Sequence, residues 1–250
     1  MKMYTSIANK WRKHLVLQKE QRLQPYLPET DLFSETLLWR YLEKHPFVIL
    51  KPVRGTGGKG IIKVSKDKGR FELQHNTQKK IFSSKSHLYA RIKQLIRTKE
   101  YLIQQGIQLL GLKGRPIDLR VVLLRPADEW EYIGAMGKMA ARNKIITNFC
   151  KGGSPIMVRN VLRKGLHLNH KECTKVEREM SEVGLMAAQC LADRYRGIRE
   201  VGLDMAVDKE GDLWILEVNT RPMYRLFRYH SDESLSPTIK KYVRRIRKRK

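Results

Sequence analysis

Residues 51–60 read KPVRGTGGKG, a glycine-rich loop that directly follows the short apolar run Phe47 to Leu50. That run predicts a buried strand ending at Lys51, and Ile61 to Lys66 predicts a second strand after the loop. Clustered glycines let backbone N–H groups cradle phosphate oxygens, and the Lys51 ammonium can add a point charge to the same phosphates. The segment therefore indicates a flap that closes over a nucleotide, with a plain flexible turn as the alternative.

Three better-known phosphate loops do not fit this segment. Gly55, Gly57 and Gly60 match the pattern GxGxxG, but a Rossmann loop opens a helix, whereas residues 61–64 continue as a strand. A P-loop needs GxxxxGK followed by Ser or Thr, which the sequence lacks. A protein kinase places its lysine after the glycine loop and needs HRD and DFG motifs, which are also missing. A flap between two antiparallel strands remains.

A second chemical signal lies in two apolar runs, GLDMAV from residue 202 and LWILEVN from residue 213. Strand alternation predicts that Ile215, Glu217 and Asn219 share one face of the second strand. Across a hairpin, Asp204 of the first strand can lie close to Glu217 and Asn219. Three oxygen donors converging at a strand end suit Mg²⁺. Salt bridges to the many cations of this chain are the alternative.

The remaining patterns predict a mixed order of helices and strands. Helices are expected over Tyr4–Gln24, Leu32–Lys44, Ser84–Arg97 and Glu172–Arg196, the second capped by Thr30 or Asp31. Further strands are expected over Phe71–Leu73, Tyr101–Gln105, Asp118–Leu124 and Glu131–Met139. This order indicates an α+β architecture.

Composition narrows the class of protein. The 250 residues include 51 Lys and Arg against 25 Asp and Glu, which gives a formal net charge of +26. Such an excess predicts attraction to polyanions, such as nucleic acid, acidic membrane surfaces or anionic wall polymers. The cations are densest in residues 236–250, for which a solvated, partly helical tail is the alternative. No apolar run approaches the roughly 20 residues that cross a bilayer, so we expect no transmembrane segment.

The cysteines predict a reduced cytoplasmic setting. Cys150, Cys173 and Cys190 are far apart and form no CxxC pair, so neither a zinc site nor a disulfide framework is expected. Residues 1–12 contain no apolar run of the kind found in signal peptides.

Over roughly residues 28–222 the chain resembles the ATP-grasp superfamily. The motifs occur in its order: strand lysine, glycine flap, hinge strand, Asp-x-Arg strand, Asn and Gly-Gly loop, then Asp and Glu-x-Asn. The sequence motifs at Leu27–Thr30, Gln104–Ile107 and Asp118–Arg120 resemble those of the YheC/YheD family of endospore coat-associated proteins. The resemblance implies an ATP-grasp fold in which two α+β subdomains enclose a nucleotide cleft, and an association with the spore coat.

The resemblance also implies which residues bind ATP. The phosphates would be contacted by Lys51 and covered by the flap glycines Gly55, Gly57, Gly58 and Gly60. The adenine would lie against a hinge made of Gln104, Gln105 and Ile107, partly through backbone groups, and the ribose hydroxyls against Asp118. For Gln104, an ordinary edge-strand position is the alternative.

Catalytic and metal-binding roles follow from the same resemblance. Arg120 and Arg142 would face the γ-phosphate and the acyl-phosphate, and Asn148 with the Lys151–Gly153 loop would line the acceptor side. One or two Mg²⁺ ions would be held by Asp204, Glu217 and Asn219. A simple ion pair with Asp118 is the alternative for Arg120, and solvation is the alternative for Arg142 and Lys151.

The expected organisation has four parts. They are a basic N-terminal helical segment (1–27), a small lid subdomain (28–106), a C-terminal subdomain with the metal site (107–235) and a basic tail (236–250). Family members normally carry a further N-terminal α/β domain, so we expect a partner chain or a polymeric substrate to complete the acceptor site.

The implied function is an ADP-forming ligase that joins a carboxylate to an amine through an acyl-phosphate. Candidate substrates are a peptide or a cell-wall or spore polymer. A non-catalytic nucleotide-binding protein of the spore coat is one alternative. A polyanion-binding protein with a relic ATP-grasp fold is another.

Overall fold

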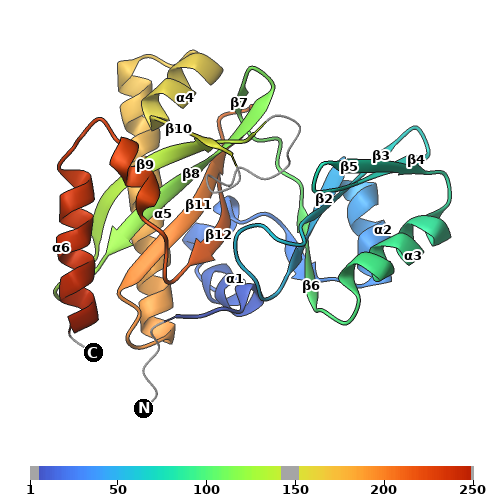
Figure 1. The fold of residues 1–250 in the computed structure, drawn as a ribbon, viewed down its shortest axis with the longest axis horizontal. Helices are drawn as coiled ribbons and strands as arrows, with labels where there is room; N and C mark the ends of the chain where they lie inside the picture. Colours follow the sequence, from blue (N-terminus) through green and yellow to red (C-terminus); the bar gives the residue numbers. More distant parts are fainter. Residues whose placement is uncertain (1–5, 142–151, 249–250) are drawn as a thin grey trace. The chain divides into compact units, whose positions relative to one another are not determined.

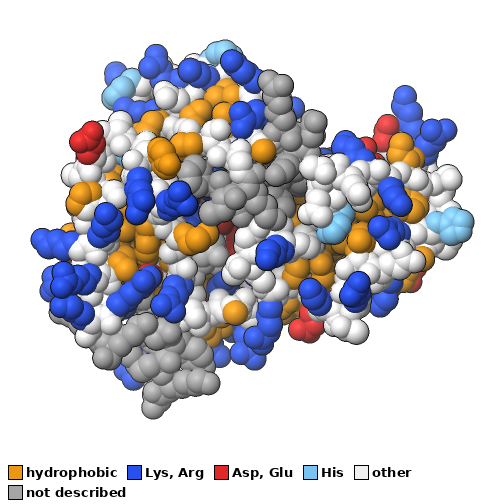
Figure 2. Space-filling model, viewed as in Figure 1, with side chains coloured by type: hydrophobic (Ala, Val, Ile, Leu, Met, Phe, Trp, Pro, Cys, Tyr) orange, Lys and Arg blue, Asp and Glu red, His pale blue; other side chains and the backbone are white. Residues whose placement is uncertain are grey.

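The computed structural model describes residues 6–141 and 152–248, which fall into two compact units (Figure 1). The smaller unit comprises residues 28–108, and the larger unit comprises the other described residues. Each unit combines helices with an antiparallel sheet and has its own hydrophobic core. Lysine and arginine side chains are scattered over the visible face of both units (Figure 2).

The smaller unit is one sheet with two helices against it. Its strands run in the order β1-β6-β2-β3-β4-β5. Their bounds are Thr30–Leu32 (β1), Phe47–Pro52 (β2), Ile62–Asp67 (β3), Arg70–His75 (β4), Gln78–Phe82 (β5) and Tyr101–Gln105 (β6). The helices are α2 (Glu35–Lys44) and α3 (Lys85–Ile96). Both helices and alternate strand residues share one core, so the other sheet face, which carries Lys51, stays outside it.

The predicted start of the second helix is wrong. Thr30–Leu32 forms β1, which pairs with β6, and α2 begins only at Glu35. Ser34 has extended backbone, and its side chain accepts a hydrogen bond from the Leu37 N–H at 3.2 Å, so Ser34 is the N-cap. The ladder with β6 satisfies the backbone of residues 30–32, which local helix signals did not reveal.

The larger unit is built on a second antiparallel sheet. Its strands run in the order β10-β9-β8-β11-β12, and β7 pairs with β8. Their bounds are Gly111–Leu112 (β7), Arg115–Leu124 (β8), Glu131–Met139 (β9), Ser154–Ile156 (β10), Glu200–Val207 (β11) and Leu213–Asn219 (β12). The helices are α1 (Lys10–Gln18), η1 (Gln21–Tyr26), α4 (Val158–Gly165), α5 (His170–Arg194), η3 (Arg225–Tyr229) and α6 (Leu235–Lys248).

The first helix is shorter than the prediction over Tyr4–Gln24. Asn9 caps α1 by accepting a hydrogen bond from the Arg12 N–H at 2.9 Å, and the chain then changes into the 3₁₀-helix η1. By contrast, the predicted strand at Tyr101–Gln105 is confirmed at both ends. The predicted strands at Phe47–Lys51 and Asp118–Leu124 are confirmed with one end shifted by one and three residues, respectively.

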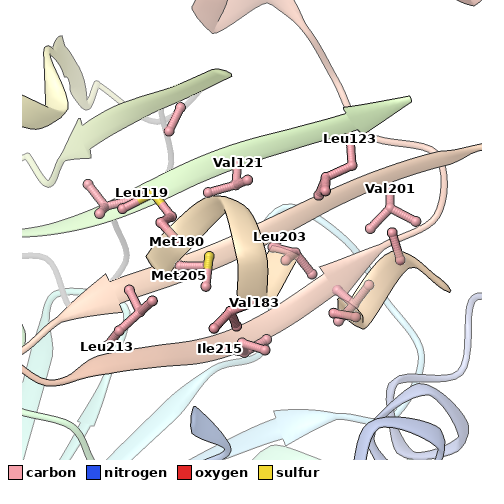
Figure 3. Packing of buried hydrophobic residues seen from close by; sticks show 14 of the residues in the cluster. Leu119, Val121, Leu123, Met180, Val183, Val201, Leu203, Met205, Leu213 and Ile215 are labelled. Atoms are coloured by element: carbon pink, nitrogen blue, oxygen red, sulfur yellow. The ribbon is translucent and has the colours of Figure 1, made fainter. Parts of the chain in front are cut away.

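The two faces of the larger sheet have different roles. One face packs under α5, where Leu119, Val121 and Leu203 meet Met180 and Val183 (Figure 3). Part of the opposite face packs under η3 and α6, in a separate cluster. The rest of that opposite face carries polar side chains, which form the candidate site.

A β-bulge decides which side chains reach the polar face. Asp204 pairs with Glu217, but its neighbour Met205 pairs with Ile215, so β12 contains one extra residue, Leu216. Ile215 therefore packs in the core, whereas Glu217 lies on the polar face with Asp204. The prediction that Ile215 shares a face with Glu217 and Asn219 is wrong, because the bulge reverses the alternation between them.

The segment predicted as a basic tail contains α6, whose apolar residues Ile239 and Ile246 are buried against the sheet. Glu200 of β11 accepts two hydrogen bonds of 2.9 Å from Arg247, which ties the end of this helix to the sheet. The basic side chains of α6 are therefore displayed on a docked helix.

Candidate functional site

The polar face of the larger sheet holds a buried ionic group, here called the Asp204 cluster: Asp118, Arg120, Lys138, Asp204 and Asn219. Arg120 donates two hydrogen bonds to the Asp204 carboxylate, at 2.9 and 3.2 Å. Lys138 Nζ lies 2.6 Å from Asp204 Oδ1, and Asn219 Nδ2 donates to Oδ2 at 3.0 Å. Side chains from β9, β8 and β12 thus converge on the Asp204 carboxylate of the adjacent strand β11.

The charges of the cluster are balanced by its own members. Burial alone would raise the pKa of Asp204, but the adjacent Arg120 and Lys138 outweigh this effect and hold that pKa far below its usual range. Burial alone would lower the pKa of Lys138, but Asp204 and Asp118 raise it. Lys138 also lies 3.1 Å from Asp118, so one ammonium bridges the two carboxylates. The Asp204 carboxylate therefore stays ionised although it is largely buried.

The alternative for Arg120, a simple ion pair with Asp118, is wrong. The guanidinium forms its ion pair with Asp204, and the ammonium of Lys138 forms the ion pair with Asp118. Lys138 is absent from the sequence-based set of site residues. Its place follows from the β8–β9 register, in which Asp118 pairs with Lys138, and local sequence patterns do not define that register.

Glu217 is the more accessible carboxylate of the candidate metal set. Its side chain is 24% exposed, compared with 15% for Asp204, and the two residues are register partners across β11 and β12. Lys10 Nζ lies 3.7 Å from Glu217 Oε1. The predicted proximity of Asp204, Glu217 and Asn219 is therefore present, and cations of the chain surround it.

Two lysines of α1, absent from the sequence-based set of site residues, also lie at this site. Lys10 pairs with Glu217, and Lys13, only 4% exposed, donates a hydrogen bond to the Val218 carbonyl. Burial lowers the pKa of Lys13 to about 8, although Glu217 opposes this shift. The available signal was that Lys13 lies one helical turn before the buried Leu17, so both share the inner helix face.

In the smaller unit, Lys51 donates a hydrogen bond to the side-chain oxygen of Gln104. Gln104 is 6% exposed, and its amide nitrogen donates to the Thr30 hydroxyl at 2.9 Å. The strand that carries Gln104 lies between β1 and β2, so the edge-strand alternative for this residue is wrong. Lys51 is thereby oriented by a buried side-chain network on the sheet face opposite the core.

The hinge residues follow directly after Gln104. The N–H of Gln105 donates to Glu29 O at 2.8 Å, and the N–H of Gly106 donates to Phe47 O at 3.0 Å. Ile107 is half-buried beyond the end of β6. These two N–H groups are therefore already used within the unit, which leaves carbonyl groups and Ile107 for the predicted contact with adenine.

The glycine loop connects two antiparallel strands, β2 and β3, as the sequence predicts. Gly55, Gly57, Gly58 and Gly60 all have positive φ, from 64° to 142°. At Gly60 a Cβ atom would meet Tyr101 Oη at 2.8 Å, so both conformation and space require glycine there. Arg142, predicted to face the γ-phosphate and the acyl-phosphate, lies outside the described residues, as do Asn148 and Lys151, predicted to line the acceptor side.

A family model described as YheC/D like ATP-grasp matches residues 3–246. The chain belongs to the YheC/D-like ATP-grasp family. It is 28% identical over 239 residues to the endospore coat-associated protein YheD of Bacillus subtilis (strain 168), covering 91% of this chain and 52% of the relative. It is 24% identical over 222 residues to the endospore coat-associated protein YheC of the same strain, covering 86% of this chain and 60% of that relative.

A third relative carries a reaction in its name. The tetrahydromethanopterin:alpha-L-glutamate ligase of Methanocaldococcus jannaschii is 25% identical over 217 residues, covering 87% of this chain and 59% of the ligase. This member of the ATP-grasp family thus spans between 52% and 60% of the length of these three relatives.

Solved structures show the same fold. The D-cycloserine synthetase DcsG matches with a TM-score of 0.59 at 11% identity, covering 95% of this chain and 70% of the synthetase. The ATP-grasp ligase PsnB, complexed with minimal precursor, matches with a TM-score of 0.54 at 14% identity, covering 95% and 60%. The ATP-grasp fold predicted from the sequence is therefore confirmed. Within the described ranges, no helix is long and apolar enough to cross a membrane.

The donor atoms of the site fit the Mg²⁺ that the ATP-grasp fold implies. Asp204, Glu217 and Asn219 offer carboxylate and amide oxygens, which are the ligands that Mg²⁺ prefers. The set contains only two carboxylates, and the described residues include no group of three or more His, Cys, Asp or Glu side chains placed to hold a metal. Such a set suits an ion that takes its other ligands from water and from phosphate oxygens.

Proposed function

We propose that this protein is a Mg-ATP-dependent ligase that joins a carboxylate to an amine and releases ADP and phosphate. The observation that carries the proposal is the ionised Asp204 carboxylate, held by Arg120 and Lys138 beside the more accessible Glu217. A purely structural ion pair would not need a second carboxylate paired across the strands. In a bound metal–nucleotide complex, both carboxylates would bind the metal ion and both cations would face the phosphates.

The reaction would proceed in two displacements. A carboxylate oxygen of the substrate attacks the γ-phosphorus of ATP, and the bond to the β–γ bridging oxygen breaks, which releases ADP and leaves an acyl-phosphate. The amine nitrogen then attacks the acyl carbon, the C–O bond to phosphate breaks, and the amine loses a proton. The sum is amide, ADP and phosphate, and no step needs a nucleophilic side chain of the protein.

The residues of the Asp204 cluster would stabilise charge on the transferred phosphoryl group. Arg120 and Lys138 are preorganised by their bonds to Asp204, so they need little rearrangement to face developing negative charge. When bound, Mg²⁺ would supply a further positive charge to the phosphate oxygens through Glu217, Asn219 and Asp204. Asp118 would contact the ribose hydroxyls. Arg142 would face the γ-phosphate and the acyl-phosphate with Arg120, and Asn148 would line the acceptor side.

The smaller unit would act as a lid. Lys51, oriented by Gln104, would bind phosphate oxygens, and the glycine loop would cover the triphosphate. Gln105 and Ile107 would contact the adenine. Exclusion of water by such a lid would protect the acyl-phosphate from hydrolysis.

The names of the relatives support this choice of reaction class. One sequence relative and the solved structural relatives are named as ligases or synthetases. The names YheC and YheD state an association with the endospore coat and no reaction. We therefore propose spore-coat association together with a ligase activity, and we propose amino acids, peptides and cell-wall precursors as the substrates to be tried first.

The test is a screen for ADP release, with product masses measured, over these three classes of carboxylate and amine. We expect a substrate pair that releases ADP and gains the mass of an amide bond, and we expect Glu217→Gln to abolish this turnover. Saturable binding of Mg-ATP without turnover of any pair would favour the second candidate, a non-catalytic nucleotide-binding coat protein. The observation that favours this second candidate is that Arg120, Lys138 and the Asn219 amide already occupy both oxygens of the Asp204 carboxylate.

A further inference from the structure

The N-terminal helix α1 packs against the edge of the larger sheet that carries the candidate metal ligands. β12 is the last strand of that sheet in the described chain, so one of its edges has no neighbouring strand there. Lys13 Nζ donates to the carbonyl of Val218, and Lys10 Nζ lies 3.7 Å from Glu217 Oε1. Residues spaced three apart on one helix face thus contact two consecutive residues of β12.

The same attachment continues one step before the helix. The backbone N–H of Ile7 donates to the Thr220 hydroxyl at 2.7 Å, directly after the end of β12. Ile7 and Leu17 are both part of the hydrophobic core of the larger unit. The segment from residue 7 to residue 17 is therefore fixed at both ends by apolar contacts, and its two lysines lie between them.

The Lys13 ammonium group is buried, which is energetically unfavourable by itself. A buried ammonium group is costly unless anions compensate it, and an apolar side chain at this position would avoid the cost, as Leu17 does one turn later. The carboxylates that act on Lys13 are Glu217 and Asp204, the two candidate metal ligands. The ammonium is thus placed where the site carries negative charge and where a triphosphate would bring more.

We propose that Lys13 is a positioning residue of the Mg-ATP site, which rests on the proposed function. By holding the Val218 carbonyl, it fixes the backbone between Glu217 and Asn219, so that both ligand side chains are directed to the polar face. Lys10, beside Glu217, adds positive charge toward the triphosphate. Helix α1 then contributes to Mg-ATP binding through these two lysines.

The test uses the full chain and measures the dissociation constant of Mg-ATP by calorimetry, together with the melting temperature. Lys13→Met keeps the length of the side chain and removes the charge and the donor. We expect it to raise the dissociation constant about tenfold or more, because loss of a hydrogen bond that involves a charged group typically weakens binding by about this factor. Lys10→Met should raise it several-fold.

Two control variants separate positioning from charge and from stability. Lys19→Met removes the same charge from an exposed position just after α1 and should leave the dissociation constant unchanged. Val161→Ala truncates a buried residue of α4 and should lower the melting temperature without changing the dissociation constant. The wild type should bind more weakly when a chelator removes Mg²⁺, and this Mg²⁺ dependence should shrink in Lys13→Met.

Each outcome decides one of two questions. Wild-type binding of Mg-ATP with an unchanged dissociation constant in Lys13→Met would overturn the role of Lys13 and leave the proposed function standing, even if the melting temperature falls. If Lys13→Met does not fold, an unchanged constant in Lys10→Met overturns the role of α1 in the site. A wild type that does not bind Mg-ATP overturns the proposed function itself.

Discussion

At the scale of single residues, the Asp204 cluster combines low exposure with complete charge pairing. Replacing Asp204 by Asn should leave Arg120 and Lys138 without their shared carboxylate. Breaking a buried ion pair in this way typically costs about 3–5 kcal/mol, and we expect such a loss in denaturant unfolding. Stabilisation by Mg-ATP should disappear as well. Asp212→Asn, at an exposed turn position, is the matched control and should change neither quantity.

The pKa of Lys13 gives a second residue-scale prediction. It is about 8 in the folded chain, compared with 10.5 for an unperturbed lysine. Between these pH values the unfolded chain binds more protons than the folded chain, so the free energy of unfolding contributed by Lys13 rises with pH. The full gain is on the order of 3 kcal/mol.

Unfolding of the wild type and of Lys13→Met should therefore be compared at pH 7.5, 9 and 10.5. Subtracting the two free energies of unfolding removes the titration of the other groups. We expect the difference to shift in favour of the wild type as the pH rises. A difference that stays constant across this range would show that Lys13 titrates normally.

At the scale of elements, the glycine loop allows the cost of backbone strain to be measured separately from the cost of a steric clash, because Gly60 and Gly69 have nearly the same φ but different surroundings. Gly60 has φ +77°, and a Cβ atom would meet Tyr101 Oη at 2.8 Å and Pro52 Cγ at 3.0 Å. Gly69, in the β3–β4 turn, has φ +78° with nothing within 4 Å of its Cβ position. Gly69→Ala should cost about 1 kcal/mol from backbone strain alone.

Gly60→Ala should cost more than Gly69→Ala and should weaken Mg-ATP binding, because the loop must shift away from Tyr101. Denaturant unfolding and calorimetric titration of both variants check this prediction. Equal stability losses with unchanged nucleotide affinity would contradict the assignment of this loop as the nucleotide flap.

Local patterns predicted most elements but could not predict what depends on pairing between distant strands. The strands 47–51 and 101–105 are short apolar runs next to turn residues, so their positions were clear. The bulge at Leu216 leaves no trace in the alternation of β12, since it is defined by the register with β11. The meeting of Asp118 and Lys138 likewise depends on the β8–β9 register.

At the scale of the whole molecule, the formal net charge of +26 raises the question of where a polyanion would bind. Apart from Arg247, which pairs with Glu200, the exposed cations of α6 form a stripe at helical spacing: Lys240, Lys241, Arg244, Arg245 and Lys248. The opposite side of α6 is buried through Ile239 and Ile246, so this stripe is presented by a docked helix. The sequence pattern predicts a basic tail, because the apolar positions Ile239 and Ile246 are few among the many cations of this segment.

We predict that this stripe carries electrostatic binding to nucleic acid. Truncating the helix would uncover the core, so the five cations should instead be changed to Gln together. Binding of a short DNA duplex is then measured from 50 to 200 mM salt. Each lost phosphate contact should reduce the slope of log affinity against log salt by about 0.9, so that the total reduction is up to about 4.5.

The matched control replaces Lys66, Lys68 and Arg70, exposed cations at the β3–β4 turn, by Gln and should leave the slope nearly unchanged. A wild-type slope retained in the α6 variant would place the contact elsewhere on the basic surface. Loss of slope in both variants would mean that net charge alone attracts the duplex, without a defined surface. Because Ile239 and Ile246 are retained, a melting temperature equal to that of the wild type would confirm that α6 stays docked during the comparison.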